Sequence, residues 1–497
     1  MAGVSRPSVP DNNATAATTA RRDALRQFVT QPRILQIAVA ATLILPLPLF
    51  YARAIADGLI SVVAILFLAN RWALRDRTWL QAAHVRLSLI FWVWLVVCTI
   101  VTGTPHAIGE AVAAIRLFLF AAALEYWVLA DARQRRYLGY AMLAAAVWII
   151  IETWQQYFFG TNIFGDPRWG SGVLTGPFER ARAGATLQYL YFVAFLPPAM
   201  FLIDSPGIGR RLAGALLLIG TVLTEAVIGQ RMPMLLVIFG LCLTGLIVRR
   251  FRWPIVVALI VFIAAVAAAK VVSPVTYDTL VIVFLQRMEH FWSTPYALLY
   301  QRAIVMVQAH PWLGLGFDGF RDNCNDPRYF RLLPWLPVTE IGAADGCTIH
   351  PHNYWLQIAT SSGLPGLALF SALCGVWLAR IGRGVFTAAP PVQTAIFVTL
   401  CTAFWPIAST TALFTVPNAG WLFLLIGWGL AEQAPGRTCA EPGQCRQQNS
   451  TSGRPPASLP PSLGASQAPC VSPSSASNWT VTSSASFCSP SLPSPAG

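Results

Sequence analysis

The sequence predicts an all-α integral membrane protein with about twelve transmembrane helices. Of its 497 residues, 55% are hydrophobic and 11% are charged, which leaves too little polar surface to cover a soluble globule of this size. The apolar residues fall into separate runs of roughly 17 to 25 residues, the length at which an α-helix crosses a bilayer with its backbone hydrogen bonds satisfied internally. Helical spans in lipid explain both observations.

Polar boundaries divide these runs into twelve predicted spans within a membrane domain of residues 34–432. The predicted spans are residues 34–52, 54–70, 86–103, 107–130, 137–158, 185–204, 212–230, 232–249, 253–270, 352–379, 391–409 and 411–431. Residues 1–33 form a polar N-terminal segment, and no small-residue cleavage site closes the first span, so we expect an uncleaved signal anchor. Residues 433–497 are rich in Ser, Pro, Gly and Ala without an apolar period, which predicts a disordered tail.

The distribution of arginines predicts the orientation of the chain in a bacterial inner membrane. The formal charge of +13 does not indicate nucleic-acid binding, because the arginines are spread between the apolar runs and form no single patch. They gather before the first span and after the even-numbered spans, at Arg21, Arg22, Arg26, Arg33, Arg71, Arg75, Arg77, Arg86, Arg133, Arg135, Arg136, Arg210, Arg211, Arg249, Arg250, Arg252, Arg380 and Arg383. The positive-inside rule then predicts that both termini are cytoplasmic.

Two odd-numbered loops are long, and both are predicted to face the periplasm. They cover residues 160–184 and 271–351, whereas the loop at residues 102–110 and the turn around Thr410 are short and carry no basic residue. The loop of residues 271–351, between spans nine and ten, has five arginines beside seven acidic residues, enough for a small outer cap. Because so long a stretch between spans is usually functional, we expect the chemistry there.

Two of the six histidines lie where this loop meets the tenth span. The loop ends in Gly-Cys-Thr-Ile-His-Pro-His-Asn at residues 346–353, and Gly-Leu-Pro-Gly-Leu follows at residues 363–367. Pro351 is predicted as the first helical residue, because its missing N–H would have no helical partner there. His350 or His352 can exchange a proton near neutral pH, but a histidine pair satisfied by water and carbonyls is an equally good interpretation.

Arginines at predicted membrane boundaries are further candidates. Arg302 begins an amphipathic segment that a Pro/Gly turn ends near Gly316, which predicts a helix on the membrane surface. Arg231 follows an apolar span at its predicted outer boundary, with Glu225 inside that span, and ionisable groups at such depth are functional candidates. The alternatives are a plain interfacial anchor for the helix and snorkelling of Arg231 to the headgroups.

Together these segments resemble the O-antigen ligase and polymerase family. The resemblance covers roughly spans six to twelve and is strongest in Arg302–Gly316, the His-Pro-His-Asn sequence and the Gly-Leu-Pro-Gly-Leu run. Gln230-Arg231 adds to it, as does Leu-Thr-Gly-Pro-Phe at residues 174–178. The chain departs from the pattern at Ser361, where many members carry a glutamate, and after Phe178, where many carry His-Pro-Asn.

The resemblance implies a C-type glycosyltransferase that moves a glycan from undecaprenyl diphosphate to an acceptor hydroxyl, with inversion and without a metal or other cofactor. The acceptor is lipid A–core for a ligase and a growing glycan for a polymerase, and the sequence does not separate the two. By resemblance, His352 is the base and Arg231 holds the leaving diphosphate, for which the planar guanidinium is well suited. The predicted substrate-binding residues are Arg302, Arg182, His350, Arg287 and Arg168.

Two other functions fit part of the sequence. A zinc site could use Cys324, Cys347, His350 and His352, although Cys-x-x-His-x-His is not a usual ligand spacing. Both cysteines lie in the loop predicted to face the oxidising compartment, so we expect a disulfide between them instead. A secondary transporter would suit twelve spans, but it predicts substrate groups at the bilayer centre, whereas Arg, His, Trp and Tyr concentrate here in a loop.

Overall fold

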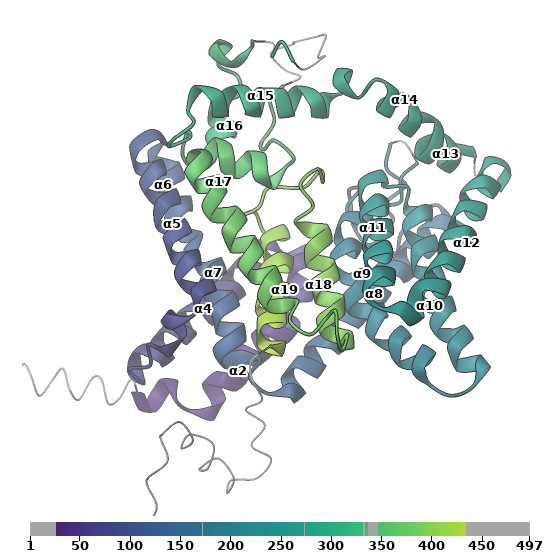
Figure 1. The fold of residues 1–497 in the computed structure, drawn as a ribbon, viewed down its shortest axis with the longest axis horizontal. Helices are drawn as coiled ribbons and strands as arrows, with labels where there is room; N and C mark the ends of the chain where they lie inside the picture. The colour runs from purple at the N-terminus through teal and green to yellow at the C-terminus, as the bar shows by residue number, and fades with distance from the viewer. Residues whose placement is uncertain (1–25, 171, 273, 332, 336–345, 434–497) are drawn as a thin grey trace, which may run out of the picture. The chain divides into compact units, whose positions relative to one another are not determined.

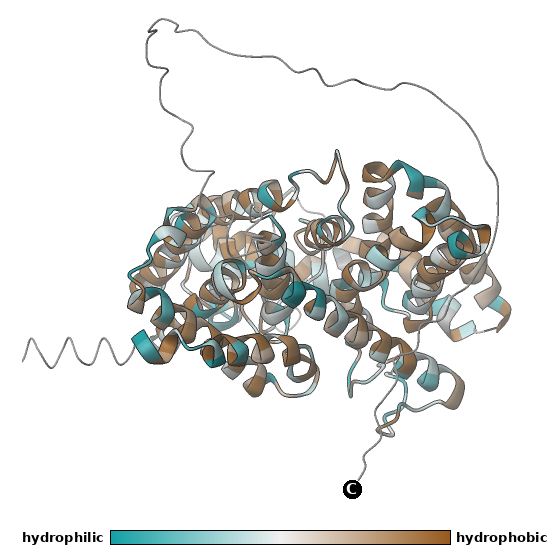
Figure 2. Cartoon of the chain, turned by 90° about the horizontal axis from the view of Figure 1, so that it is seen from below, coloured by the Kyte–Doolittle hydropathy of each residue, from teal (hydrophilic) through white to brown (hydrophobic). Residues whose placement is uncertain are grey.

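The computed structural model describes residues 26–170, 172–272, 274–331, 333–335 and 346–433. Within these ranges the chain is helical, with two isolated β-bridges and no strand (Figure 1). Apolar residues predominate along most of the helices (Figure 2). The tail predicted to be disordered lies outside the described residues from residue 434 onward, as does the N-terminal segment before Arg26.

The helices follow one another in the order that the apolar runs predict. Before the long loop they are α2 (Pro32–Ile44), α3 (Pro46–Tyr51), α4 (Arg53–Ala73), α5 (Ala83–Thr102), α6 (Pro105–Ala113), α7 (Ile115–Ala123), α8 (Ala132–Phe159), α9 (Ala183–Asp204), α10 (Ile208–Ile228), α11 (Arg231–Ile247) and α12 (Arg252–Val272). The long loop contains α13 (Pro274–Tyr277), α14 (Val283–Glu289), α15 (Pro295–Ala309) and α16 (Gly319–Asn323), and α17 (Tyr354–Ile381), α18 (Pro391–Ala403) and α19 (Asn418–Glu432) follow it.

Eight helical stretches of the described chain are long and apolar enough to cross a membrane. Six of them are the single helices α4, α5, α8, α9, α10 and α17. The other two are Pro105–Val128, which contains α6 and α7, and Arg249–Val272, which contains α12. Shorter apolar helices are α2, α11 and α18. This is the architecture of a multi-pass membrane protein. Each of the twelve predicted ranges overlaps a helix, and the number of twelve membrane crossings stays a prediction.

Prolines move several helix ends away from their predicted positions. The predicted span 34–52 is two helices, because α2 ends at Ile44 and α3 begins at Pro46. The short turn predicted around Thr410 is wrong, since α18 ends at Ala403 and α19 begins only at Asn418. The long connection contains Pro406 and Pro417, and proline lacks the N–H that a continuing helix needs while pushing the preceding residue out of helical geometry.

The start of α17 also differs from the prediction. Asn353 is the N-cap, and its Oδ1 accepts the backbone N–H of Leu356 at 3.1 Å. Pro351 therefore lies before the cap and is not the first helical residue. The side-chain amide satisfies a donor that would otherwise be unpaired at the helix end, and it does so from a residue type that favours this position.

The predicted amphipathic helix is α15, which runs across the end of the bundle where α17 begins (Figure 1). Thr294 caps it through its Oγ1, Pro295 is its first residue, and it ends at Ala309 before His310 and Pro311. Packing against α17 fixes its position. We call this end of the bundle, which is formed by α15, α16 and the first residue of α17, the α15 end.

A break in α17 receives the segment that follows α15. Around Gly363 the helix leaves helical geometry, and the carbonyls of Thr360 and Ser361 accept the backbone N–H groups of Leu315 and Gly316 at 2.8 and 3.0 Å. In exchange, the N–H of Leu364 donates to the Pro311 carbonyl at 2.7 Å. Pro365 has no N–H to offer Ser361 one helical turn earlier, so that carbonyl is available for the incoming segment.

Glycine is required where the two backbones meet. A Cβ on Gly314, whose φ is +66°, would lie 2.6 Å from the backbone of Ser361 and of Ser362. A Cβ on Gly363, whose φ is +68°, would overlap the backbone of Trp312. The same segment reaches α5, where Thr99 Oγ1 accepts the N–H of Phe317 at 2.9 Å. The Gly-Leu-Pro-Gly-Leu run and the Pro/Gly turn after α15 are therefore two halves of one junction.

The opposite ends of α5 and α17 are joined by buried charges. Glu125, just after α7, accepts hydrogen bonds from Arg380 of α17 and from His84 of α5, each at 2.7 Å. Glu125 and His84 are both almost fully buried. Breaking such a pair by removing one partner would leave an uncompensated charge inside the protein. These contacts give Glu125 a structural role.

We predict that the junction does not tolerate a side chain at Gly314. Alanine there pays the cost of positive φ, about 1–2 kcal/mol, and also clashes with the backbone of α17, for a further cost of about 1–3 kcal/mol. Gly384→Ala is the matched control, because Gly384 has a φ of +78° but open space around its Cβ. The apparent Tm of purified protein in detergent should fall clearly more for Gly314→Ala. Equal shifts in the two variants would contradict the junction.

Candidate functional site

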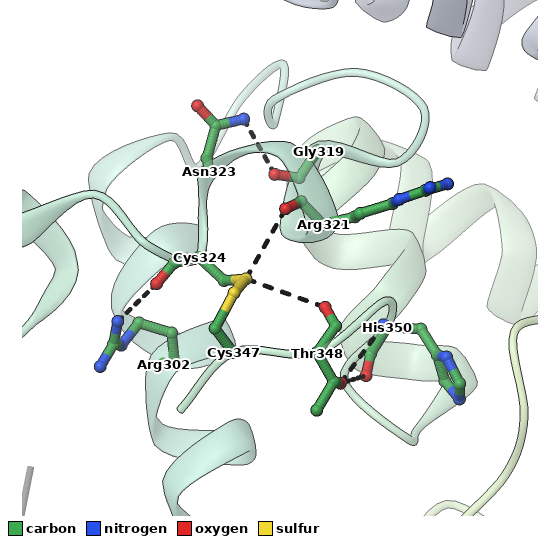
Figure 3. The surroundings of a disulfide bond; sticks show 8 residues. All are labelled: Arg302, Gly319, Arg321, Asn323, Cys324, Cys347, Thr348 and His350. Atoms are coloured by element: carbon green, nitrogen blue, oxygen red, sulfur yellow. Dashed lines mark hydrogen bonds between the residues drawn. A yellow bond between two sulfur atoms is a disulfide. The ribbon is translucent and has the colours of Figure 1, made fainter. Parts of the chain in front are cut away.

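The segment of residues 346–353 carries the two predicted histidines and is tied down at both ends. At its start, Cys347 forms a disulfide with Cys324, whose Cα lies 5.1 Å away, and the carbonyl of Cys324 accepts a hydrogen bond from Arg302 (Figure 3). At its end, Asn353 Nδ2 donates to the Pro406 carbonyl at 2.7 Å. The histidine segment is therefore held between the loop after α16 and the connection between α18 and α19.

Two reciprocal hydrogen bonds fix His352 against Thr410. The Thr410 N–H donates to the His352 carbonyl at 2.8 Å, and His352 Nδ1 lies 3.1 Å from the Thr410 carbonyl. His352 has a φ of +52°, which is uncommon for a residue with a side chain and persists only where surrounding contacts enforce it. The hydrogen bond to the ring comes from the connection between α18 and α19, far from His352 in the sequence.

This contact defines which ring nitrogen of His352 can react. A carbonyl oxygen can only accept a hydrogen bond, so Nδ1 must carry a proton and donate the hydrogen bond to the Thr410 carbonyl. In the neutral ring, Nε2 then holds the free lone pair. Burial lowers the pKa of His352 below its ordinary value, so the neutral form dominates at neutral pH. The geometry therefore supplies an imidazole prepared to accept a proton at Nε2.

His350 packs against His352 with ring centroids 4.2 Å apart. Its side chain is buried, and neither ring nitrogen has a hydrogen-bond partner among the described residues. Burial, with a contribution from His352, lowers the pKa of His350 to about 4. A charged His350 would destabilise positive charge on its neighbour, so the neutral His350 permits His352 to accept a proton.

Arg231 is the first residue of α11 and lies beside the turn that precedes α9. Gln230 joins the two, because its Oε1 accepts the N–H of Ala185 at 2.9 Å and its Nε2 donates to the Ala181 carbonyl. Ala181 and Ala185 flank Arg182 in sequence, so this amide bridge places the backbone of Arg182 next to the start of α11. A Cβ on Gly184 would overlap the side chains of Gln230 and Glu225, which shows how close the contact is.

Tyr296 contacts His352 and lies within electrostatic range of Arg231. Arg231 interacts electrostatically with Arg287 of α14 and with Tyr296 of α15. The Tyr296 ring also contacts His352 edge-on, with centroids 5.5 Å apart. The structure thus brings His352, His350, Arg231 and Arg287 into one neighbourhood at the α15 end. We call these four residues with Tyr296 the histidine–arginine site.

Arg302 lies at the start of the histidine segment, next to Gly346 and the disulfide. Its guanidinium donates a hydrogen bond to the Cys324 carbonyl (Figure 3). It also stacks over the Phe330 ring at 4.0 Å and packs against Gly346, where a Cβ would be 2.8 Å from Nη2. The side chain is almost fully buried, and this burial lowers the pKa of Arg302. These contacts hold the disulfide loop in place, so they give Arg302 a positioning role in addition to its predicted contact with substrate.

The two remaining predicted arginines lie in the loop of residues 160–182. Arg168 donates to the Tyr157 carbonyl at 2.8 Å and lies over the Tyr157 ring at 5.6 Å. Arg182 interacts electrostatically with Arg53, Arg180 and Glu179. The loop therefore presents a second group of charges, distinct in its partners from the histidine–arginine site.

Several residues of these groups were not candidates from the sequence. Tyr296 and Thr410 carry no motif, and their roles depend on contacts with His352 from distant parts of the chain. Arg53 carried a signal, because it lies between the first two predicted spans, where the positive-inside pattern does not expect an arginine. The zinc alternative would need Cys324 and Cys347 as free thiolates, and no group of metal-ligating side chains occurs in the described chain.

A known protein family matches the part of the chain that contains the histidine–arginine site. Fold and site define a multi-pass membrane protein with a histidine–arginine site at one end of its helices. Residues 212–371 match the family described as O-antigen ligase, and no curated protein matches the chain. The matched segment contains all five residues of the histidine–arginine site. Residues 212–371 are thus similar to the O-antigen ligase family, which confirms the predicted resemblance.

The depressed pKa of His350 predicts an acid-sensitive fold. Unfolded histidine has its ordinary pKa near 6.5 while folded His350 has a pKa of about 4, so protons favour the unfolded chain as the pH falls between these values. The stability lost across this window is up to roughly 3 kcal/mol. His350→Gln cannot titrate, so its apparent Tm should fall less than that of the wild type between about pH 7 and about pH 4.5.

His106→Gln is the matched control for this measurement, because its ring is largely exposed on α6. Asp318 contributes with the opposite sign, since burial and the neighbouring Glu110 raise the pKa of its carboxyl to about 6. That contribution is the same in wild type and His350→Gln, so it cancels when these two proteins are compared. Identical pH slopes of the apparent Tm for wild type and His350→Gln would refute the assignment.

Proposed function

We propose that the protein is an O-antigen ligase that transfers a glycan from undecaprenyl diphosphate to an acceptor hydroxyl of lipid A–core. The observation that carries the proposal is the contact of Tyr296 with His352, with Tyr296 also within electrostatic range of Arg231, inside the segment that matches the O-antigen ligase family. A base and a permanent cation in one neighbourhood are what such a transfer needs.

In the proposed reaction, the acceptor hydroxyl attacks the anomeric carbon of the donor glycan. His352 Nε2 takes the hydroxyl proton, the bond from the glycan to the diphosphate breaks, and the configuration inverts. Arg231 and Arg287 hold the departing diphosphate, so arginine in place of a divalent metal ion neutralises its charge. His350 stays neutral beside the base, and Arg302 orders the loop next to them. Arg182 and Arg168 complete the predicted set of substrate-binding arginines.

The proposal includes a location and an orientation. Twelve spans in residues 34–432 of a bacterial inner membrane would place residues 1–33 and 433–497 in the cytoplasm and the loop of residues 271–351 in the periplasm. The disulfide between Cys324 and Cys347 supports this orientation, because disulfides persist in oxidising compartments. The α15 end would then be the periplasmic face, where lipid-linked glycans are available.

Loss of His352 should remove the base without removing the donor site. Purified His352→Ala is expected to bind lipid-linked donor and to transfer its glycan about 100- to 10,000-fold more slowly, the usual contribution of general-base catalysis. His352→Asn tests the chemistry more sharply, because asparagine tolerates positive φ and can still donate to Thr410 but cannot act as a base. His106→Ala is the control. Near-normal transfer by His352→Asn would reduce His352 to a binding residue.

Arg231 should be needed for departure of the diphosphate. Arg231→Ala is expected to lower the transfer rate by about 10- to 100-fold, the equivalent of one charge-assisted contact, and Arg231→Lys should also be impaired because it cannot form the bidentate pair. Arg328→Lys is the matched control, since its side chain is exposed and paired with Asp326. Full complementation of a deletion strain by Arg231→Ala would exclude the assignment.

The same deletion strain identifies the acceptor. A strain without a ligase accumulates long glycan on its lipid carrier and has lipopolysaccharide without that glycan. A strain without a polymerase carries single repeat units on lipid A–core instead. The banding of its lipopolysaccharide therefore decides between the proposed ligase and a polymerase of the same family.

A further inference from the structure

A cavity of about 400 Å³ lies between the end of α3 and the loop of residues 160–182. Its walls include Phe50, Tyr51, Phe164, Phe178, Arg180 and Arg182. The volume is in the range of small-molecule sites. The lining contains neither His352 nor Arg231, so this cavity is not the histidine–arginine site.

Four aromatic rings form one side of the cavity. Phe50 contacts Phe178 edge-on with centroids 5.6 Å apart, and Tyr51 contacts Phe164 in the same way at 5.9 Å. The Tyr51 hydroxyl accepts a hydrogen bond from the Trp148 indole at 2.6 Å, which fixes its ring. Phe164 remains 60% exposed and Tyr51 46% exposed, so both present ring surface that no protein group covers.

The charged side chains of the lining are Arg180, Arg182, Asp166 and Glu179, and Arg53 adds a third arginine beside Arg182. Arg182 interacts unfavourably with Arg180 and Arg53 and favourably with Glu179. Its pKa is lowered, first by burial and then by the two neighbouring arginines. Like charges gathered beside a cavity repel one another, and a bound anion would relieve that repulsion. Arginine forks match the geometry of phosphate in particular.

The loop that carries this group is firmly folded. Gln156 Oε1 accepts the N–H of Thr175 at 2.7 Å, and Asn162 Nδ2 donates to the Gly176 carbonyl at 2.9 Å. Glu152 accepts the N–H of Ile163 at 3.0 Å. These buried polar side chains of α8 and of the loop itself hold the loop wall of the cavity in a fixed position, which lowers the cost of binding a ligand.

We propose that this cavity binds a phosphorylated saccharide, with Phe164 and Tyr51 against the sugar and Arg180 and Arg182 on the phosphate. A lipid tail alone is a poor fit to four charged side chains, and a simple anion would leave the exposed rings unused. The inference rests on the proposed function. The Gln230 bridge places Arg182 beside the start of α11, so a saccharide held there would be the acceptor glycan of the transfer, next to the donor diphosphate at Arg231.

Binding can be measured without turnover in the His352→Ala protein reconstituted in nanodiscs. The probes are glucose 1-phosphate, glucose and inorganic phosphate in solution, and lipid A–core incorporated in the disc. The variants, in the same background, are Arg180→Gln with Arg182→Gln, and Phe164→Ala. Arg328→Gln is the control for the loss of an arginine, and the apparent Tm of each protein checks its folding. The same variants with His352 intact provide kcat and separate KM values for donor and acceptor.

The wild-type cavity should bind glucose 1-phosphate, and the double arginine variant should weaken it at least about tenfold, the effect of losing one charge-assisted bond. Phe164→Ala should weaken the sugar phosphate but not inorganic phosphate. An increase in the acceptor KM alone would support lipid A–core as the source of the phosphorylated saccharide. Loss of soluble-probe binding with unchanged acceptor KM would support a soluble sugar phosphate.

Equal affinity for inorganic phosphate and glucose 1-phosphate, no effect of Phe164→Ala, or no binding by the wild-type cavity would each overturn the inference. These results are separable from failure of the proposed function. If transfer does not depend on His352 or Arg231, binding at the cavity still stands. If the cavity variants bind and transfer normally, the histidine–arginine site is unaffected.

Discussion

The backbone exchange between residues 311–316 and the break in α17 is the constraint on which the site depends. Two carbonyls that a continuous helix would use internally instead accept hydrogen bonds from the segment after α15. In the same segment, the Phe317 N–H donates to Thr99 of α5. These hydrogen bonds fix α5, α15 and α17 relative to one another. Because α15 carries Tyr296 and α17 begins directly after His352, their mutual position follows from this junction. A shift of α15 along α17 would separate Tyr296 from the histidine ring.

The histidine segment itself has an anchor of a different chemical kind at each end. The disulfide is covalent and, on the chain-entropy model, closing a loop of this length contributes roughly 3 kcal/mol. At the other end, Thr410 and Asn353 provide hydrogen bonds from the connection between α18 and α19. Together they hold His352 at a positive φ that the isolated peptide would not favour. The fold therefore uses local strain to aim Nε2 away from Thr410.

The sequence predicted the helices well because each apolar run of span length has few alternatives in lipid. It failed at residues 404–417, where an apolar composition continues but prolines stop the helices, and at Pro351, where the Asn353 cap decides the helix start. His352 and Arg231 could be proposed as candidates from motifs, and the cysteine pair could be predicted from the expected compartment. Their partners could not, since Thr410 and Tyr296 approach His352 only through tertiary contacts, and a single sequence does not show which distant residues meet.

The carbonyl partner of His352 has a consequence for the timing of proton transfer in the proposed reaction. In serine hydrolases a carboxylate supports the histidine once it is charged. Thr410 offers only a dipole, while His350 and two arginines lie nearby, so an imidazolium at this position would be short-lived. The proton would have to pass on quickly, and the diphosphate that has just departed is the strongest acceptor in the neighbourhood. In such a site, His352 would pass the proton from the acceptor hydroxyl to the departed diphosphate and would not hold it.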